Sequence, residues 1–368
     1  MSRVTLAVLG ALGQTQVKYV RAVRFGAAQG LVGEVYREIE RDFGVLAPPM
    51  TLHSPVPGVL AGAWLMLRET MLVPGQVDRV VKEAMATAVS VANTCPFCVT
   101  VHSRTYGGMT DGSAGAAALT QGRVDTIEDP AVGAGLTWAQ ASVHADTAAT
   151  SGIPFTAAQT PEYVGLVCMM QYLNRMVNVF LGDAPMPPGA PRFALGGVMA
   201  VLGGLVRSAA SKQPTPGTSL ALLPEVSLPV DLGWAAASPS VAGAMARAAA
   251  AVEEAGARSV PDEVRELVRA ELAGWRGESR GISRAWVEDL VAGLPAARQP
   301  AARLALLIAF ASYQVDKQVV AEFRRRDPAD ATLVELTAWS AMAASRRIGE
   351  WAAPAAIAEK AEPGTASS

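Results

Sequence analysis

The chain is poor in the residues that most reactive protein sites use. Its 368 residues include only three cysteines and three histidines. Three cysteines cannot build the dense disulfide network of a small secreted domain, so that class of scaffold is excluded. A Gly-rich dinucleotide fingerprint is missing as well, so we predict no bound NADH and no other cofactor.

Charged and aromatic residues are also scarce, at 17% and 6% of the chain. The net charge of −2 argues against nucleic acid or an anionic membrane as a partner, because both need a basic face. The apolar run at residues 193–206 is only 14 residues long, which is too short to cross a bilayer. The run at residues 4–12 lacks a persuasive signal-peptide cleavage site. We therefore expect a cytoplasmic protein with no membrane-spanning segment.

Alanine, valine, leucine, glycine and methionine are abundant instead, a composition that favours tightly packed helices over sheets. Apolar residues recur at helical spacing, as at Leu31, Val35 and Ile39. Glycine pairs at residues 107–112 predict a loop, and further helices are expected at residues 130–147 and 161–181. The fold class predicted from the sequence is all-α.

The length favours two domains joined by a linker. Residues 1–182 read as a first helical domain, and residues 183–232 as a Pro-rich linker that contains the apolar helix of residues 193–206. The helical pattern resumes over residues 233–352. Residues 353–368 hold few large apolar side chains and are expected to be a disordered tail.

The two helical blocks resemble each other. Residues 130–146 align without gaps with residues 300–316, at an offset of 170, and seven of the seventeen positions are identical. Residues 54–55 pair with 238–239 at an offset of 184, so the second block has lost about 14 residues between these anchors. We interpret the second block as a degenerate repeat, because it contains no Cys and no His.

Two of the three cysteines and one of the three histidines lie within eight residues of each other, at Cys95, Cys98 and His102. Thr94 is a plausible N-cap and Pro96 is tolerated in a first helical turn. Cys95, Cys98 and His102 would then share one helix face, at spacings of three and four residues. A helix N-terminus favours thiolate, and an imidazole can accept the thiol proton. The pattern indicates thiol redox chemistry.

The histidine lies one helical turn from Cys98, so we predict Cys98 as the attacking thiolate and Cys95 as the resolving thiol. Thioredoxin-like sites usually assign the two roles the other way round. Glu83, on the preceding predicted helix, could hold His102 in one tautomer or pass protons through water.

Other readings of these residues remain open. The C-x-x-C pair and His102 supply three zinc ligands, and Glu83 would have to be the fourth. The cysteines could also be inert core residues, a reading that suits Cys168 in its apolar surroundings. His144 reads as an ordinary helix histidine and His53 as a loop or capping residue.

The spacing of Glu83, Cys95, Cys98 and His102 resembles the active-site signature of the alkylhydroperoxidase D family, within the carboxymuconolactone decarboxylase-like superfamily. Residues 172–178 resemble that family's aromatic-x-Asn-Arg helix. The resemblance covers about residues 52–182. It implies an all-α bundle and oligomers of interlocked helical units. The chain departs from the family in having a second copy without catalytic residues, so we expect tandem bundles of which the second is degenerate. It also implies Cys98 as the peroxidatic residue, Cys95 as the resolving residue, and Glu83 with His102 as a proton relay.

The leading functional hypothesis is a thiol-dependent peroxidase that reduces an alkyl or hydrogen peroxide through the Cys95–Cys98 pair. A lipoyl or thioredoxin-like dithiol partner would regenerate the thiols. The alternatives are a non-catalytic or redox-sensing helical assembly protein, and a decarboxylase-like lyase. We also expect a homo-oligomer, with a trimer of two-unit chains as the leading arrangement.

Overall fold

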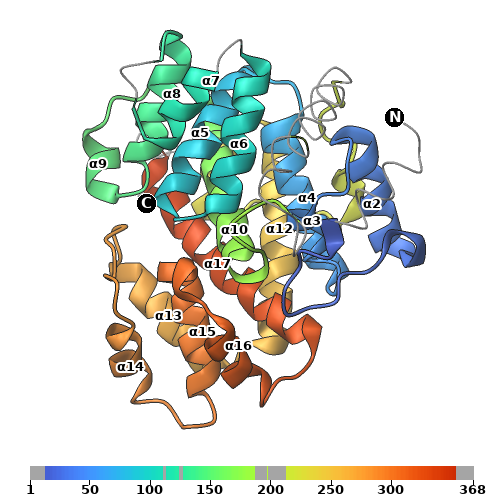
Figure 1. Ribbon diagram of the computed structural model, residues 1–368, viewed down its shortest axis with the longest axis vertical. Helices are drawn as coiled ribbons and strands as arrows, with labels where there is room; N and C mark the ends of the chain where they lie inside the picture. Colours follow the sequence, from blue (N-terminus) through green and yellow to red (C-terminus); the bar gives the residue numbers. More distant parts are fainter. Residues whose placement is uncertain (1–12, 111–112, 124–126, 187–196, 198–212, 354–368) are drawn as a thin grey trace, which may run out of the picture.

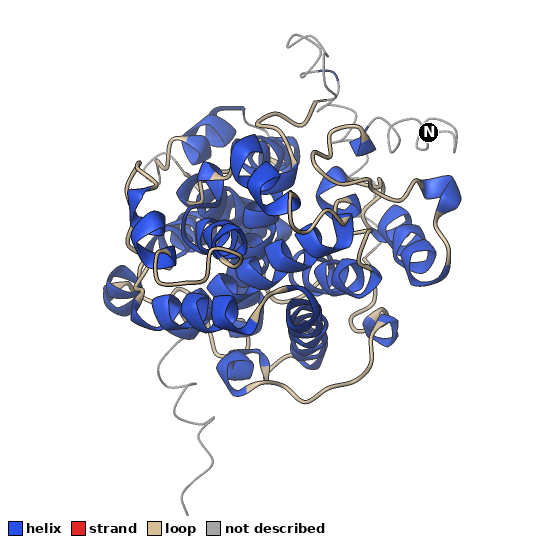
Figure 2. Ribbon diagram, turned by 90° about the horizontal axis from the view of Figure 1, so that it is seen from below, coloured by secondary structure: helices blue, strands red, loops and turns tan. Residues whose placement is uncertain are grey.

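The protein is built from helices packed around one core (Figures 1 and 2). A computed structural model describes residues 13–110, 113–123, 127–186, 197 and 213–353. Within these ranges every regular element is a helix and there is no strand. The predicted all-α class is therefore confirmed. None of the helices in the described part of the chain combines the length and apolarity that a bilayer crossing requires.

The first half carries the predicted helices with small differences in their bounds. Its main elements are α2 (Gly30–Asp42), α3 (Pro48–Thr51), α4 (Pro57–Leu67), α5 (Arg79–Ala92), α6 (Pro96–Met109), α7 (Ser113–Thr120), α8 (Pro130–Ala141), α9 (Ala145–Thr150) and α10 (Thr160–Phe180). A short 3-10 turn, η1 (Phe25–Ala27), precedes them, and a π-helical turn, η2 (Arg68–Leu72), extends α4. Several of these helices begin with proline at the first or second position, where the missing N–H costs nothing.

Two predicted boundaries in this half are wrong. The helix expected over residues 130–147 is interrupted at Ser142, so that α8 and α9 are separate. The loop expected at Gly107 and Gly108 is instead the last turn of α6, because tertiary packing outweighs the low helix propensity of glycine.

The second half repeats the order of helices seen in the first. It comprises η4 (Leu220–Leu222), η5 (Val230–Ala235), α12 (Pro239–Ser259), α13 (Asp262–Gly274), α14 (Ala285–Val291), α15 (Gln299–Ala311), η6 (Ser312–Gln314), α16 (Lys317–Arg324) and α17 (Asp330–Ala352). The aligned stretches at the offset of 170 fall on α8 with α15, and on α10 with α17. The apolar helix predicted at residues 193–206 lies outside the described residues, apart from residue 197. The proposed domain boundaries stay a prediction.

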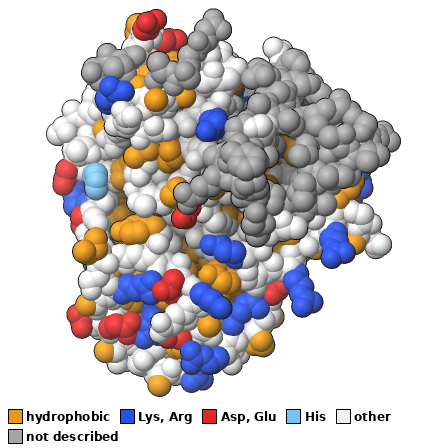
Figure 3. All heavy atoms as spheres, in the orientation of Figure 1, with side chains coloured by type: hydrophobic (Ala, Val, Ile, Leu, Met, Phe, Trp, Pro, Cys, Tyr) orange, Lys and Arg blue, Asp and Glu red, His pale blue; other side chains and the backbone are white. Residues whose placement is uncertain are grey.

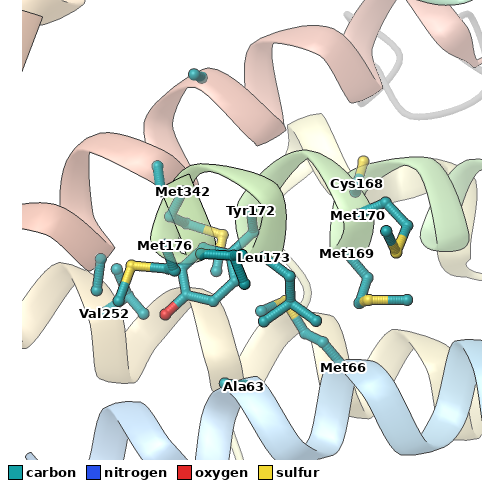
Figure 4. Packing of buried hydrophobic residues seen from close by; sticks show 14 of the residues in the cluster. Ala63, Met66, Cys168, Met169, Met170, Tyr172, Leu173, Met176, Val252 and Met342 are labelled. Carbon is teal, nitrogen blue, oxygen red and sulfur yellow. The ribbon is translucent and has the colours of Figure 1, made fainter. Parts of the chain in front are cut away.

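The halves meet through their equivalent helices. Helix α10 packs along α17, and α4 packs along α12, at the centre of the molecule (Figure 1). The buried side chains of both halves form one continuous core. Methionines fill much of the contact between α10, α4 and α17, among them Met66, Met169, Met176 and Met342 (Figure 4). An unbranched thioether adapts to irregular gaps between crossing helices.

Charged side chains gather on the lower part of the face shown in Figure 3, which Figure 1 assigns to the helices of the second half. Charged side chains of the second half form ion pairs with one another, including Arg303 with Glu288 and Arg284 with Asp316. Exposed pairs of this kind contribute little to stability. This side of the second half is a solvated surface.

The approach of α4 to α12 depends on Gly62. A Cβ at Gly62 would lie 3.0 Å from Cα and 3.3 Å from Cβ of Ala248, whereas a Cβ at Gly58 would meet only Cβ of Ala251, at 4.0 Å. We expect Gly62→Val to lower the free energy of unfolding by about 1–3 kcal/mol, the usual cost of overpacking. Thermal and urea unfolding followed by circular dichroism measure this.

Gly58→Val is the matched control, because it adds the same side chain to the same helix where there is room for it. An equal loss of stability in both variants would show that helix propensity, and not the contact between the halves, is responsible.

Candidate active site

The two thiols lie at a tight turn between α5 and α6. Asn93 ends α5, the N–H of Thr94 donates to the carbonyl of Val91, and the N–H of Cys95 donates to the carbonyl of Ser90. These are the two hydrogen bonds of a Schellman motif. Thr94 has a φ of +49°, in the left-handed position that glycine usually occupies.

The N-cap of α6 is therefore Cys95 and not the predicted Thr94. Pro96, expected within the first turn, is the first residue of α6, so Cys95 precedes that turn and Cys98 lies within it. Cys95 thus belongs to two helix ends at once, because its N–H closes α5 and its carbonyl accepts the first hydrogen bond of α6. Its backbone position is fixed from both sides.

The two sulfur atoms face each other. Sγ of Cys95 and Sγ of Cys98 are 2.7 Å apart, and both cysteines are free thiols. Cys95 is fully buried and Cys98 is 5% exposed. A disulfide needs two cysteines on closely apposed backbone positions, which this turn provides. The pair can therefore close without a rearrangement of the helices.

Burial raises the pKa of the Cys98 thiol well above its usual range, and the hydrogen bond and charge of the neighbouring Cys95 raise this pKa further. The helix N-terminus favours the thiolate form of Cys98, but burial acts in the opposite direction. Desolvation outweighs the helix dipole, whose effect is modest and confined to the first turn. Ionisation of Cys98 requires a nearby base.

A histidine–carboxylate pair, His102 with Glu83, lies one helical turn beyond Cys98. Nδ1 of His102 lies 2.6 Å from Oε2 of Glu83, and Nε and Nη2 of Arg79 donate to the other carboxylate oxygen at 2.8 and 2.6 Å. Glu83 is 1% exposed. Burial alone would raise the pKa of Glu83, but Arg79 and His102 together hold it below its usual value.

The ionised Glu83 fixes the tautomer of His102. A carboxylate can only accept, so Nδ1 of His102 carries the proton and donates it. Nε2 of the neutral ring is then the acceptor nitrogen. His102 lies one helical turn after Cys98 on α6, so the structure brings all four predicted residues into one region.

A family model described as the carboxymuconolactone decarboxylase family matches residues 59–141. These residues run from α4 to the end of α8 and include the four residues of the site. An alkyl hydroperoxide reductase of Mycobacterium tuberculosis is 37% identical over 343 residues, which is 92% of this chain and 96% of that protein. The chain belongs to the carboxymuconolactone decarboxylase-like superfamily. The resemblance predicted from the sequence is confirmed, and no solved structure matches the chain.

This member of the superfamily uses polar side chains of α10 to hold the end of α5. Nδ2 of Asn174 donates to Oγ of Ser90 at 3.0 Å. Nδ2 of Asn178 donates to the carbonyl of Asn93 at 3.1 Å. Both asparagines belong to residues 172–178, the stretch that resembles the family's aromatic-x-Asn-Arg helix, and no local pattern predicts their partners.

Arg79 was missed by the sequence analysis. Its position four residues before Glu83 on a predicted helix is the signal that could have identified it, because residues i and i+4 face each other.

The remaining cysteine and histidines lie apart from this site. Cys168 is fully buried on α10, with its Sγ 3.7 Å from the carbonyl of Ser345 on α17, and burial raises its pKa to about 12. Burial lowers the pKa of His53 to about 4, and its Nδ1 contacts the carbonyl of Met50. His144 is the N-cap residue of α9. No cluster of three or more His, Cys, Asp or Glu side chains suitable for a metal occurs among the described residues.

We expect Arg79→Met to lower the free energy of unfolding by about 3–5 kcal/mol, because it leaves the buried Glu83 carboxylate without its guanidinium. Urea unfolding at pH 7 measures the loss. The double variant Arg79→Met, Glu83→Gln removes the charge as well and should recover most of this loss. A double variant as unstable as Arg79→Met would contradict the assigned role of the ion pair.

The ionisation of Glu83 also predicts a pH dependence of stability. Its folded pKa lies below the ordinary value of 4.5, so the fold favours the ionised form. The contribution is complete above pH 4.5 and is lost as the pH falls through the folded pKa. The difference in unfolding free energy between the wild type and Glu83→Gln should shrink as the pH falls below about 4.5. A difference that stays unchanged down to pH 3 would argue against an ionised Glu83.

Proposed function

We propose that the protein is a thiol-dependent peroxidase that reduces alkyl or hydrogen peroxides through Cys98 and Cys95. The observation that carries the proposal is the contact of Glu83 with Nδ1 of His102, which leaves the other ring nitrogen free to accept a proton one turn from Cys98. The second thiol is already in contact with the first. The similarity to an alkyl hydroperoxide reductase over nearly the whole chain supports the same activity.

In the first step, the Cys98 thiol passes its proton to Nε2 of His102 and the thiolate attacks the outer oxygen of the peroxide. The O–O bond breaks, an S–O bond forms, and the leaving alkoxide takes the proton from His102 to become an alcohol. Cys98 is now a sulfenic acid. Glu83 stabilises the imidazolium that exists between the two proton transfers.

In the second step, Cys95 attacks the sulfur of the Cys98 sulfenic acid, a disulfide forms and water leaves. The contact between the two sulfur atoms gives this condensation a high effective concentration. An external dithiol then supplies two electrons and two protons and becomes a disulfide itself. A lipoyl or thioredoxin-like protein in the cytoplasm fits this requirement, and the chain is proposed to act as a homo-oligomer.

A second candidate function is that of a redox-sensing assembly protein without significant turnover. The high pKa and the burial of Cys98 favour it, because a protonated and shielded thiol reacts slowly. The two candidates differ in one measurable respect. A peroxidase consumes peroxide many times over in the presence of a dithiol, whereas a sensor is oxidised once.

The decisive measurement is the consumption of cumene hydroperoxide and of hydrogen peroxide with dihydrolipoamide as the electron donor. We expect Cys98→Ser to lower kcat/KM by at least about 1000-fold, because the nucleophile is removed. Cys95→Ser should still form sulfenic acid on Cys98 in a single turnover, which dimedone labelling and mass spectrometry detect. Full turnover by Cys98→Ser would sink the proposal.

Cys168→Ala is the matched control, because Cys168 is a buried thiol outside the site. It should retain wild-type turnover in the same assay.

A further inference from the structure

The turn that presents Cys95 contains one unfavourable residue. Thr94 adopts the left-handed conformation with φ +49°, which a β-branched residue rarely takes. Such a conformation persists only where the neighbouring structure holds it. The contacts around Thr94 are therefore the contacts that keep Cys95 in place.

Helix α10 supplies these contacts from within the first half. Asn174 binds the side chain of Ser90, whose carbonyl accepts the N–H of Cys95. Asn178, one turn further along α10, binds the carbonyl of Asn93. The two asparagines hold the end of α5 on both sides of its last turn.

The second half of the chain contacts this same segment of α10 from its other side. Nδ2 of Asn178 has two protons, and it also donates to Oγ of Ser312 at 3.0 Å. Nε of the buried Arg175 donates to the carbonyl of Ala309 at 3.1 Å. Ala309 lies near the end of α15, and Ser312 is the first residue of η6. The corner between α15 and η6 in the second half therefore contacts the part of α10 that holds the turn with Cys95.

The internal repeat provides a comparison for this arrangement. At the offset of 170, Asn178 corresponds to Ile348 on α17, while Asn174 and Arg175 correspond to Ala344 and Ser345. Ser142, the counterpart of Ser312, donates its hydroxyl to Ala139 of its own helix. The residues that hold the corner beside the thiols are thus replaced by apolar or small residues at the equivalent positions of α17. The counterpart corner is held differently, by Nε1 of Trp351, which donates to the carbonyl of Ser142 at 2.9 Å.

We infer that Asn178 and Ser312 are positioning residues of the thiol pair, and that the second half contributes to the site by fixing Cys95 against Cys98. An effect of these residues on peroxide turnover rests on the proposed peroxidase function, whereas an effect on the equilibrium between the dithiol and the disulfide does not. Holding one sulfur against the other raises the effective concentration of the attacking thiol, so it favours the disulfide over the dithiol.

The test is the redox equilibrium of the full-length protein with mixtures of reduced and oxidised dithiothreitol, in the absence of peroxide. Two electrons and two protons pass from dithiothreitol to the Cys95–Cys98 disulfide, which breaks as the dithiothreitol disulfide forms. The oxidised fraction is measured by alkylation of free thiols and mass spectrometry of the peptide that contains both cysteines. We expect Asn178→Ala to lower the equilibrium constant for disulfide formation about tenfold, which corresponds to about 30 mV.

Ser312→Ala should shift the equilibrium in the same direction by about threefold, because it removes only one of the two acceptors of Asn178. If Asn178→Ala fails to fold, the shift measured for Ser312→Ala alone tests whether this contact positions the thiols. Adding Thr94→Gly to Asn178→Ala should restore much of the wild-type equilibrium, since glycine adopts the left-handed conformation without strain.

Ile348→Ala is the matched control at the equivalent position of α17. It should destabilise the protein by creating a cavity, yet leave the equilibrium constant within twofold of the wild type. If Ser312→Ala and the folded Asn178 variant shift the equilibrium no more than Ile348→Ala does, the inference is wrong. If the variants show these shifts relative to the wild type but the wild type does not turn over peroxide, the inference is supported and the proposed function is refuted.

Discussion

The packing of α10 along α17 is the contact on which the rest of the structure depends. Both helices are buried over most of their length, and α4 and α12 cross beside them (Figure 4). Removal of apolar surface from water is the main favourable term in folding, and of the helix pairs in the described residues α10 and α17 contact each other most extensively. Because α17 and η6 fix one side of α10, the other side can hold the end of α5. The position of the thiols therefore depends, through α10 and α5, on the contact between the two halves.

Polar residues within this apolar contact determine its register. Gln171, Asn174 and Arg175 lie on a helix that is otherwise lined by methionine, valine and leucine, and all three are buried. A buried polar group costs free energy unless it is hydrogen-bonded, and each of these makes specific bonds to α5, to α15 or to its own helix. Burial lowers the pKa of Arg175 only to about 10, so it stays charged at neutral pH. A shift of α10 by one residue would break its bonds to α5 and α15.

The sequence predicts the local features of this protein well and the long-range ones poorly. Helical spacing and proline positions place most of the helices, and the spacing of Glu83, Cys95, Cys98 and His102 identifies the site. The N-cap was assigned to Thr94 because threonine is a good cap, but a left-handed φ cannot be read from a single threonine. The contact of Asn178 with Ser312 joins residues 134 positions apart, which no local pattern reveals. The high pKa of Cys98 has the same origin, since burial is set by the tertiary structure.

The chemistry of the site follows from the contrast between its two buried acids. Glu83 and Cys98 are both shielded from water, which disfavours the charged form of each. Glu83 is nevertheless ionised, because Arg79 and His102 bind its two oxygens, whereas burial and the neighbouring Cys95 raise the pKa of Cys98 and favour its protonated form. The negative charge of the resting site therefore lies on the carboxylate and not on the sulfur. In the proposed mechanism it reaches the sulfur when His102 accepts the thiol proton, and the carboxylate then stabilises the imidazolium beside it. The same proposal makes the reactivity of the pair depend on a substrate that can complete the proton transfer.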